Sequence, residues 1–183
     1  MYFDTTGKSN TRETIARAVD FAQKRGVQHI VVASNTGDTA LLLKDCGINC
    51  VCITHAQGFV HNGKNEMSAG TREELEASGM RVLTTSHVLS GAERGLSSKL
   101  GGIYPAEIIA NTLRFFGQGT KVAVEVSVMA LDAGLVPYGV PIIGIGGTGR
   151  GADTALLLQP AHAQHILETK IYEIICKPGE GGL

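Results

Sequence analysis

The stretch "VQHIVVASNTGDTALLLKDCG", Val27 to Gly47, decides the fold. It opens with apolar residues that are continuous from Ile30 to Ala33, a pattern typical of a strand buried on both faces, as in a parallel sheet. Hydroxyl, amide and glycine residues then occupy Ser34 to Thr39, and a second apolar pattern begins at once. The stretch therefore predicts a buried strand, a tight turn and a helix from about Asp38 to Asp45.

The flanking sequence continues the alternation of helices and strands. Asn10 and Thr71 each precede a glutamate by three residues, which predicts a capping box at the start of each of two helices. Residues 121–134 fit both a strand and a helix, and their length and the terminal Gly134 favour the helix. Residues 90–102 are rich in glycine and serine and are expected to form an excursion without core residues. The expected strands are 27–34, 48–55, 80–87, 140–147, 153–160 and 169–178, and the further expected helices are 11–26, 71–79 and 105–117.

Composition limits the class of protein. The 183 residues fit one domain, 1–183, and 43% hydrophobic against 18% charged residues indicates a compact globular chain with much buried sheet. A net charge of −1 without a basic run gives no footprint for nucleic acid. No apolar run reaches the length of a membrane span, and the start "MYFDTTGKSN" has no signal pattern, so a cytoplasmic protein away from membranes is expected. The uncharged, apolar elements leave room for a homo-oligomer.

The four cysteines do not form a metal-binding pattern. Cys50 and Cys52 are two residues apart, which is not a zinc-ribbon spacing, and no second pair follows them. We therefore expect no metal site and interpret the cysteines as small hydrophobic core residues.

The turn after the first strand has the composition of a phosphate-binding loop. A strand that runs directly into a helix exposes backbone N–H groups at the positive end of that helix. The hydroxyls of Ser34, Thr36 and Thr39 add short donors. Gly37 allows a tight turn and a close approach of the backbone to a ligand. The alternative is an ordinary turn in which Asp38 caps the helix.

A resemblance to a known family adds to this interpretation. The segment "ETIARAVDFAQKRGVQHIVVASNTGDTALLLKDCGINCVCITH", Glu13 to His55, resembles the core of the pyruvate kinase C-terminal domain, in its helix, its "IVV" strand, its hydroxyl-rich glycine turn and its "VCIT" strand. The segments "VAVEVSVMALDAG" and "GIGGTGRGADTALLLQPAH" resemble a small stand-alone group of prokaryotic proteins built on that domain, known as pyruvate kinase α/β domain-like. That second resemblance covers nearly the whole chain.

The resemblance implies a fold. It is a three-layer α/β/α sandwich with a mostly parallel mixed sheet, in which the first five expected strands take the order 3-2-1-4-5. Strands 1 and 4 are then neighbours, and ligands of open α/β sheets bind at such a switch point, outside the carboxyl ends of the strands. The loop Ser34–Thr39 follows strand 1, and the glycine-rich loop Gly146–Gly151 follows strand 4. The two loops are therefore expected to face each other.

The resemblance also implies a ligand. In pyruvate kinases the first loop binds a phosphate of an allosteric sugar bisphosphate. The residue after the glycine is commonly arginine there and is Asp38 here, which argues against a bisphosphate and favours a monophosphate ester. For the stand-alone group the implied ligand is flavin mononucleotide (FMN). The expected ligand-binding residues are Ser34, Asn35, Thr36, Gly37, Thr39, Gly146, Gly147, Thr148, Gly149 and Arg150.

Two other motifs do not support a nucleotide-binding fingerprint. Gly144 to Gly149 matches G-x-G-x-x-G after a strand, but no convincing helix follows, and a dinucleotide fold needs one. Thr6 to Ser9, "TGKS", fails as a P-loop because Tyr2 stands where the first glycine is required.

The catalytic candidates are few. His55 and His87 end expected strands and could act as acid and base, although each also fits a polar strand terminus. Glu125 and Asp153 are expected near the same edge. The sequence thus favours binding of a small phosphorylated ligand without pyruvate kinase activity, since nothing in it resembles the pyruvate kinase catalytic barrel. The alternative is a small flavin-dependent oxidoreductase or an enzyme acting on a phosphorylated metabolite.

Overall fold

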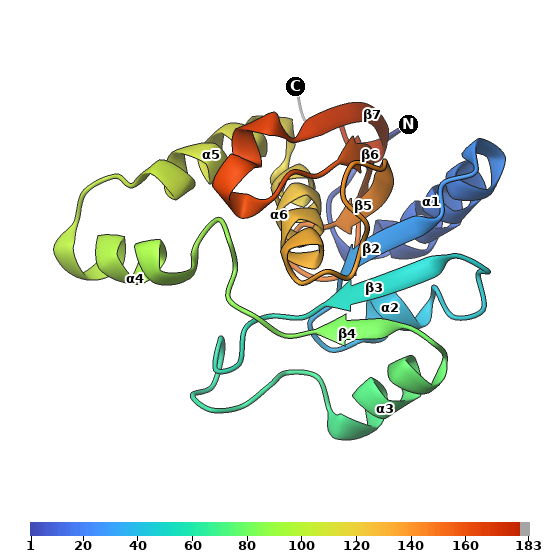
Figure 1. Ribbon diagram of the computed structural model, residues 1–183, viewed down its shortest axis with the longest axis horizontal. Helices are drawn as coiled ribbons and strands as arrows, with labels where there is room; N and C mark the ends of the chain where they lie inside the picture. Colours follow the sequence, from blue (N-terminus) through green and yellow to red (C-terminus); the bar gives the residue numbers. More distant parts are fainter. Residues whose placement is uncertain (180–183) are drawn as a thin grey trace.

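A computed structural model describes residues 1–179. Its strands form one seven-stranded sheet in the order β1-β7-β6-β5-β2-β3-β4, and Figure 1 shows the sheet with helices around it. The strands are β1 (Tyr2–Phe3), β2 (His29–Ala33), β3 (Asn49–Ile53), β4 (Arg81–Leu83), β5 (Ile142–Gly146), β6 (Thr154–Gln159) and β7 (Lys170–Pro178). The helices are α1 (Thr11–Arg25), α2 (Asp38–Leu41), α3 (Ala69–Ala77), α4 (Gly91–Leu100), α5 (Pro105–Leu113) and α6 (Gln118–Asp132).

The sheet has the mixed topology that was predicted. Strands β4, β3, β2 and β5 are parallel neighbours, and β6 pairs antiparallel with both β5 and β7. The order β4-β3-β2-β5-β6 is the predicted 3-2-1-4-5, so that expectation is confirmed. The two-residue β1 was not expected, and it adds an edge strand parallel to β7.

Helices cover both faces of the sheet and make the three layers. Ile30 and Val32 of β2 pack into one core with α1 and α3, whereas Val31 packs into the other core with α6. This alternation follows from the period of two residues in a strand. Because β2 and β5 are buried on both faces, β5 is continuously apolar and β2 is so from Ile30 onward.

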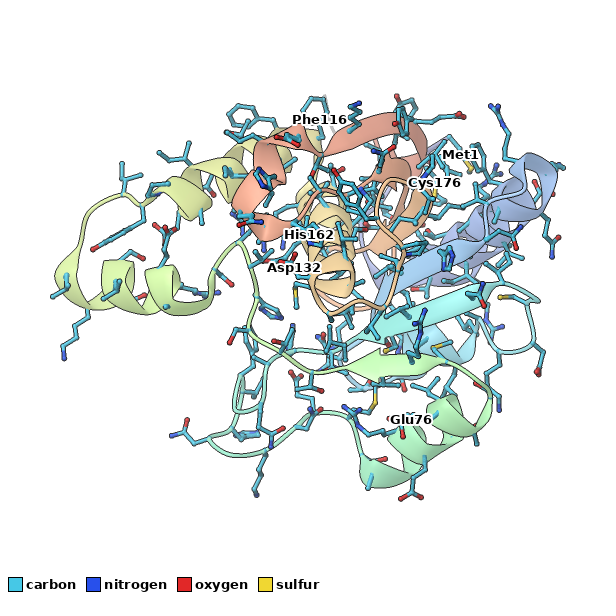
Figure 2. The ribbon with its side chains drawn as sticks, in the orientation of Figure 1. Met1, Glu76, Phe116, Asp132, His162 and Cys176 are labelled. Carbon is cyan, nitrogen blue, oxygen red and sulfur yellow. The ribbon has the colours of Figure 1, made fainter. Side chains whose placement is uncertain are left out.

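The ambiguous segment at residue 121 is a helix, as expected, and α6 begins slightly earlier than predicted, at Gln118. Its last residue, Asp132, lies beside His162, and Figure 2 shows the two side chains together. Asp132 Oδ1 is 2.8 Å from His162 Nδ1. This contact holds the turn after β6 against the end of α6.

Two helix starts differ from the capping-box predictions. The side chain of Asn10 donates to the Thr5 carbonyl at 2.6 Å and makes no capping bond to α1. Helix α3 begins at Ala69 because Ser68 caps it, its hydroxyl accepting the Thr71 N–H at 3.0 Å. The N-cap of α3 is therefore three residues earlier than the expected Thr71.

Helix α2 is shorter than the expected segment to Asp45. After Leu41 the backbone N–H groups bond to carbonyls three residues back, as in the pair Leu43 to Ala40, and Asp45 has a φ of 59°. These tighter bonds end the α-helix after four residues. Leu43 is buried while Leu42 is 37% exposed, so the leucine run spans two faces.

The expected excursion at residues 90–102 contains a helix, α4, which the sequence interpretation missed. None of its residues is buried, so it has no core-facing stripe of the kind that predicts a helix. Figure 1 shows α4 projecting from the body of the molecule. Leu96, Leu100 and Ile103 are exposed along this segment. Between Met1 and Gly179 no helix is both long and apolar enough to cross a membrane.

Candidate functional site

A cleft of about 810 Å³ opens where the loops after β2 and β5 meet. These strands are neighbours at the switch point of the sheet, so their carboxyl ends lie at one edge. We call this the main cleft. It is lined by Lys8, Ser9, Thr11, Arg12, Ala33, Ser34, Asn35, Thr36, Asp38, Thr39, Leu42, His55, Gln118, Val122, Gly147, Gly149, Arg150 and Gly151.

The turn after β2 is ordered by the Ser34 hydroxyl. This buried oxygen accepts the N–H groups of Thr39 at 3.2 Å and Ala40 at 3.3 Å. Within the described chain, the N–H groups of residues 35–38 donate no hydrogen bond to protein. The turn therefore offers four successive backbone donors, while Ser34 serves the turn itself.

Gly37 has a structural reason for being glycine. Its φ is 95°, a conformation that disfavours any Cβ, and an added Cβ would lie 2.4 Å from Thr71 Cγ2. Gly37 thus packs against α3 and is not part of the cleft wall. Thr36 and Thr39 do line the cleft, and Thr39 is 5% exposed.

Asp153 holds the loop after β5 in place. Its buried carboxylate accepts the N–H of Gly7 at 2.8 Å, the N–H of Thr148 at 3.1 Å and the hydroxyl of Thr154 at 2.8 Å. Thr11 adds a second tie, since its hydroxyl accepts the Ala152 N–H at 3.0 Å. The loop is therefore fastened to the segment before α1. Asp153, considered above as a catalytic candidate, has a positioning role.

Most glycines of this loop allow close packing within the protein. A Cβ on Gly146 would lie 2.3 Å from the Gly119 carbonyl, and one on Gly147 would lie 2.3 Å from the Gly151 carbonyl. Gly149 differs, because nothing lies within 4 Å of its Cβ position and it faces the main cleft. No helix follows the loop, since β6 comes next. The expectation that no helix follows the G-x-G-x-x-G match is thus confirmed.

The sequence interpretation missed the contribution of Lys8, Ser9, Thr11 and Arg12 to the cleft wall. A signal for it was available in the topology. A helix that leads into a parallel strand runs opposite to that strand, so the N-terminus of α1 lies at the carboxyl edge of the sheet. The positive end of this 15-residue helix is therefore at the cleft. The segment "TGKS", Thr6 to Ser9, was considered only as a P-loop, so the place of Lys8 and Ser9 at this edge of the sheet was overlooked.

The main cleft is electropositive on balance. Lys8, Arg12 and Arg150 line it, and among residues 1–179 Asp38 is the only acidic residue on its wall. No ion pair involving these four side chains occurs in the part of the chain that the structure describes. Three unpaired cations beside the unpaired N–H groups of the lining residues Asn35, Thr36 and Asp38 form a surface suited to an anion.

The ten predicted ligand-binding residues divide into two sets. The main cleft brings together Ser34, Asn35, Thr36, Thr39, Gly147, Gly149 and Arg150. Gly37, Gly146 and Thr148 do not line it and support the two loops from behind.

A second cleft, which we call the inner cleft, lies next to the main one and has a volume of about 420 Å³. Both clefts share Ala33, Asn35, His55, Gln118 and Val122 on their walls. The inner cleft follows the carboxyl ends of β3 and β4, and it also contains Phe59, His87, Lys121 and Glu125.

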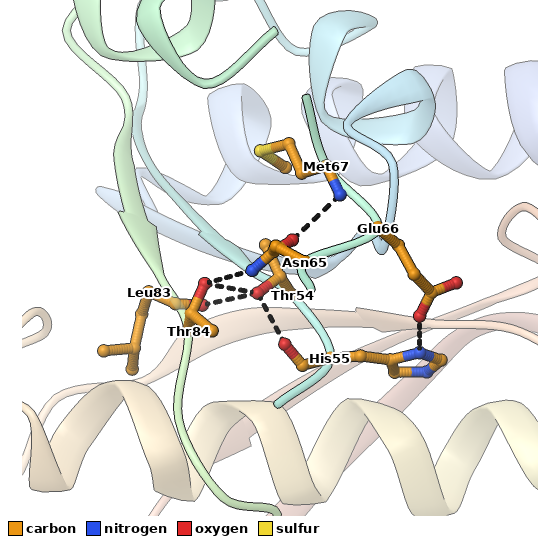
Figure 3. A network of polar contacts seen from close by, with 7 residues as sticks. All are labelled: Thr54, His55, Asn65, Glu66, Met67, Leu83 and Thr84. Carbon is orange, nitrogen blue, oxygen red and sulfur yellow. Dashed lines mark hydrogen bonds and ion pairs between the residues drawn. The ribbon is translucent and has the colours of Figure 1, made fainter. Parts of the chain in front are cut away.

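The two predicted histidines meet in the inner cleft. The ring centroids of His55 and His87 are 5.4 Å apart, and Phe59 contacts both rings. Glu66 pairs with His55, its Oε1 being 2.5 Å from Nδ1 (Figure 3). Burial lowers the pKa of His87, with Lys121 and His55 acting in the same direction and Glu125 opposing them.

Glu125 and Lys121 form a buried ion pair on α6. Glu125 also accepts the N–H of Leu89 at 2.9 Å, which ties the loop after β4 to the helix. Glu125 is therefore engaged in positioning this loop. Among residues 1–179 no group of three or more histidine, cysteine, aspartate or glutamate side chains is arranged to hold a metal ion.

The fold and the cleft together define a class: a three-layer α/β/α protein with an anion-suited cleft at the switch point of its sheet. More specifically, the chain belongs to the pyruvate kinase alpha/beta domain family, which its sequence matches over residues 12–158.

Among solved structures, the chain is similar to pyruvate kinases from Cryptosporidium parvum. One crystal structure is 15% identical, with a TM-score of 0.41, and the match covers 80% of this chain and 22% of that one. The structure in complex with ADP is 16% identical, with a TM-score of 0.41, and the match covers 88% of this chain and 23% of that one. The chain thus spans less than a quarter of the length of these enzymes.

Proposed function

We propose that the main cleft binds the phosphate of a small ligand, and that FMN is the ligand. The observation that carries the proposal is that the main cleft is lined both by Asn35, Thr36 and Asp38, whose N–H groups are unpaired, and by the unpaired cations Lys8, Arg12 and Arg150. Charge-assisted hydrogen bonds of this kind are about twice as strong as neutral ones. A single phosphate suits the cleft, because Asp38 would repel part of a more highly charged ligand.

The cleft residues fit the rest of FMN as well. A volume of about 810 Å³ lies within the range of roughly 300–1,000 Å³ for small-molecule sites. Ala33, Leu42 and Val122 supply apolar wall, and Asn35 and Gln118 supply amides toward the inner cleft. Apolar contacts with a few placed polar groups are typical of cofactor sites.

The proposal includes an absence of pyruvate kinase activity in this chain. The small ligand is bound in the cytoplasm, and neither nucleic acid nor a membrane is a partner. Formation of ATP from phosphoenolpyruvate and ADP by the purified protein tests this part, since sustained turnover by the protein itself would overturn it.

The binding proposal is tested by the double variant Thr36→Ala/Thr39→Ala. Loss of two charge-assisted hydrogen bonds, at about 1.5–3 kcal/mol each, should weaken FMN binding by about a few hundredfold. Thr112→Ala is the matched control, because its hydroxyl bonds to the Ile108 carbonyl on exposed α5. Wild-type affinity in a double variant with an unchanged circular dichroism spectrum would overturn the proposal.

A further inference from the structure

His55 forms a carboxylate–imidazole pair with Glu66 through one ring nitrogen, and Phe59 packs against the ring. Glu66 Oε1 lies 2.5 Å from His55 Nδ1, and Phe59 covers the ring with a centroid distance of 3.9 Å. Figure 3 shows the Glu66 contact at one ring nitrogen. The second nitrogen, Nε2, makes no hydrogen bond to any described residue, and 27% of the side chain is exposed.

The loop carrying Glu66 is anchored on both sides of that residue. Asn65 donates to the Thr84 hydroxyl at 3.2 Å, and its amide oxygen accepts the Met67 N–H at 2.8 Å (Figure 3). Thr54 contacts Thr84 at 2.7 Å and donates to the His55 carbonyl at 2.8 Å. The backbones of Glu66 and His55 are therefore tied to the same strand ends, which fixes the pair.

This pairing favours one of the two tautomers of the neutral ring. A carboxylate at Nδ1 favours the neutral tautomer with its proton on Nδ1, which leaves a lone pair on Nε2. The carboxylate also stabilises the imidazolium that forms when Nε2 takes up a proton. His55 is one of the residues shared by the main and inner clefts, so this lone pair is available to a ligand that crosses from one cleft to the other.

Two amides stand at the same boundary. Asn35 and Gln118 line both clefts. The Gln118 oxygen accepts from Arg114 Nε at 2.7 Å, so its NH₂ group is left to donate. Amide donors at this position are suited to an oxygen atom on which negative charge develops.

We propose that His55 is a general base for a phosphate ester that carries a carbonyl group. The phosphate occupies the main cleft, as in the proposed function on which this inference rests. The C–H next to the carbonyl gives its proton to Nε2, and the C–H electron pair becomes the C=C bond of an enolate. The carbonyl oxygen receives the charge and accepts hydrogen bonds from Asn35 and Gln118. Return of a proton to carbon completes the cycle, so no co-reactant is consumed.

The test is hydrogen–deuterium exchange into dihydroxyacetone phosphate, a small phosphate ester with CH₂ groups beside its carbonyl. The full-length protein, expressed in a host without triosephosphate isomerase, is incubated with the ester in D₂O and followed by proton NMR. We expect exchange with the wild type and a loss of about 100-fold or more with His55→Gln, since general-base catalysis contributes roughly 10²–10⁴-fold.

His162→Gln is the matched control. His162 is a second imidazole with a carboxylate at Nδ1, Asp132 Oδ1 at 2.8 Å. Asp132 is the last residue of α6 and Gln118 the first, so about 20 Å of helix separates this pair from Gln118 at the boundary of the two clefts, and neither Asp132 nor His162 lines either cleft. Exchange by His162→Gln should equal that of the wild type.

Glu66 acts as a positioning residue, and its variant has a distinct signature. Glu66→Gln should slow exchange at saturating ester by about tenfold or more and leave the ester concentration for half-maximal rate nearly unchanged, because the variant removes the carboxylate that orients the ring but leaves the phosphate site intact.

Inorganic phosphate binding, measured by calorimetry, separates the two proposals. Phosphate binding without exchange, or exchange that persists in His55→Gln, overturns the general-base proposal and leaves the binding function standing. If inorganic phosphate does not bind, the proposed binding function is overturned, and the general-base proposal that rests on it is overturned with it. A Glu66→Gln variant that exchanges at the wild-type rate, or that loses rate only through weaker binding of the ester, overturns the role of Glu66.

Discussion

The Asp153 carboxylate lies 2.8 Å from the backbone nitrogen of Gly7, a residue 146 positions away in the chain. The same oxygen, Oδ2, accepts the N–H of Thr148 at 3.1 Å. One buried side chain thus joins the segment that carries Lys8 to the loop that carries Arg150. The geometry of the main cleft depends on this contact.

Replacing Asp153 by alanine should lower the free energy of unfolding by about 3 kcal/mol, because buried donors left without an acceptor cost about 1–3 kcal/mol each. Asp153→Asn keeps one carbonyl oxygen as an acceptor, so its free energy of unfolding should fall by about half as much. Urea denaturation measures both variants. An alanine variant within about 0.5 kcal/mol of the wild type would show that the contact is not needed for the fold.

Gly149 and Gly151 form a natural comparison, since both have positive φ values, 72° and 76°. A Cβ at Gly149 meets nothing within 4 Å, whereas one at Gly151 would lie 2.2 Å from Thr11 Oγ1. Gly149→Ala should therefore cost only the conformational term of about 1–2 kcal/mol. Gly151→Ala should cost at least about 2 kcal/mol more and weaken FMN binding. Equal melting temperatures for the two variants would contradict this account.

Arg150→Gln should weaken FMN binding by about tenfold, or about 1.4 kcal/mol, and leave riboflavin binding unchanged, because only FMN carries a phosphate. The salt dependence of FMN binding should also become shallower. Arg25→Gln is the control, since Arg25 ends α1 and pairs with Glu173 at 3.4 Å on the surface. If Arg150→Gln affects both ligands alike, the residue does not contact the phosphate.

The partly buried His87 should make stability fall as the pH is lowered. Burial lowers its pKa, chiefly by disfavouring the charged ring, so the folded state resists a proton that the unfolded state accepts below about pH 6.5. Stability from this group is full above that pH and is lost below it. His87→Gln should flatten the change in unfolding free energy between pH 7.5 and 5.5. His165→Gln is the control, because His165 is exposed. If the unfolding free energy of His87→Gln depends on pH as steeply as that of the wild type, His87 does not cause the effect.

Much of the fold could be predicted from the sequence because β2 and β5 are buried on both faces. Their uninterrupted apolar runs and the turn residues beside them made the strands visible, and the resemblance to a known domain supplied their order. Helix α4 was missed because it has no buried face and therefore no apolar period. Helix α2 was predicted too long because Leu42 and Leu43 continue the apolar pattern beyond its last residue. They lie in turns whose N–H groups bond to the carbonyl three residues back.

The candidate site was predictable to the extent that it lies in loops after strands. Thr36 and Arg150 follow buried strands that are neighbours in the sheet, so their meeting followed from the topology. Lys8 and Arg12 contribute through the start of a helix, and local sequence around them carries no comparable signal. The partner of His55 was equally hidden, since Glu66 lies 11 residues away in an irregular loop.

Phosphate binding by the main cleft is tested most simply by comparing FMN with riboflavin in calorimetric titrations of the wild-type protein. The two ligands differ in the phosphate alone, so the ratio of their dissociation constants isolates the phosphate contribution. FMN is expected to bind at least about 100-fold more tightly than riboflavin, which corresponds to two or more charge-assisted hydrogen bonds at the turn after β2. Equal affinity for the two ligands would contradict it and would leave residues Ser34 to Thr39 as an ordinary turn.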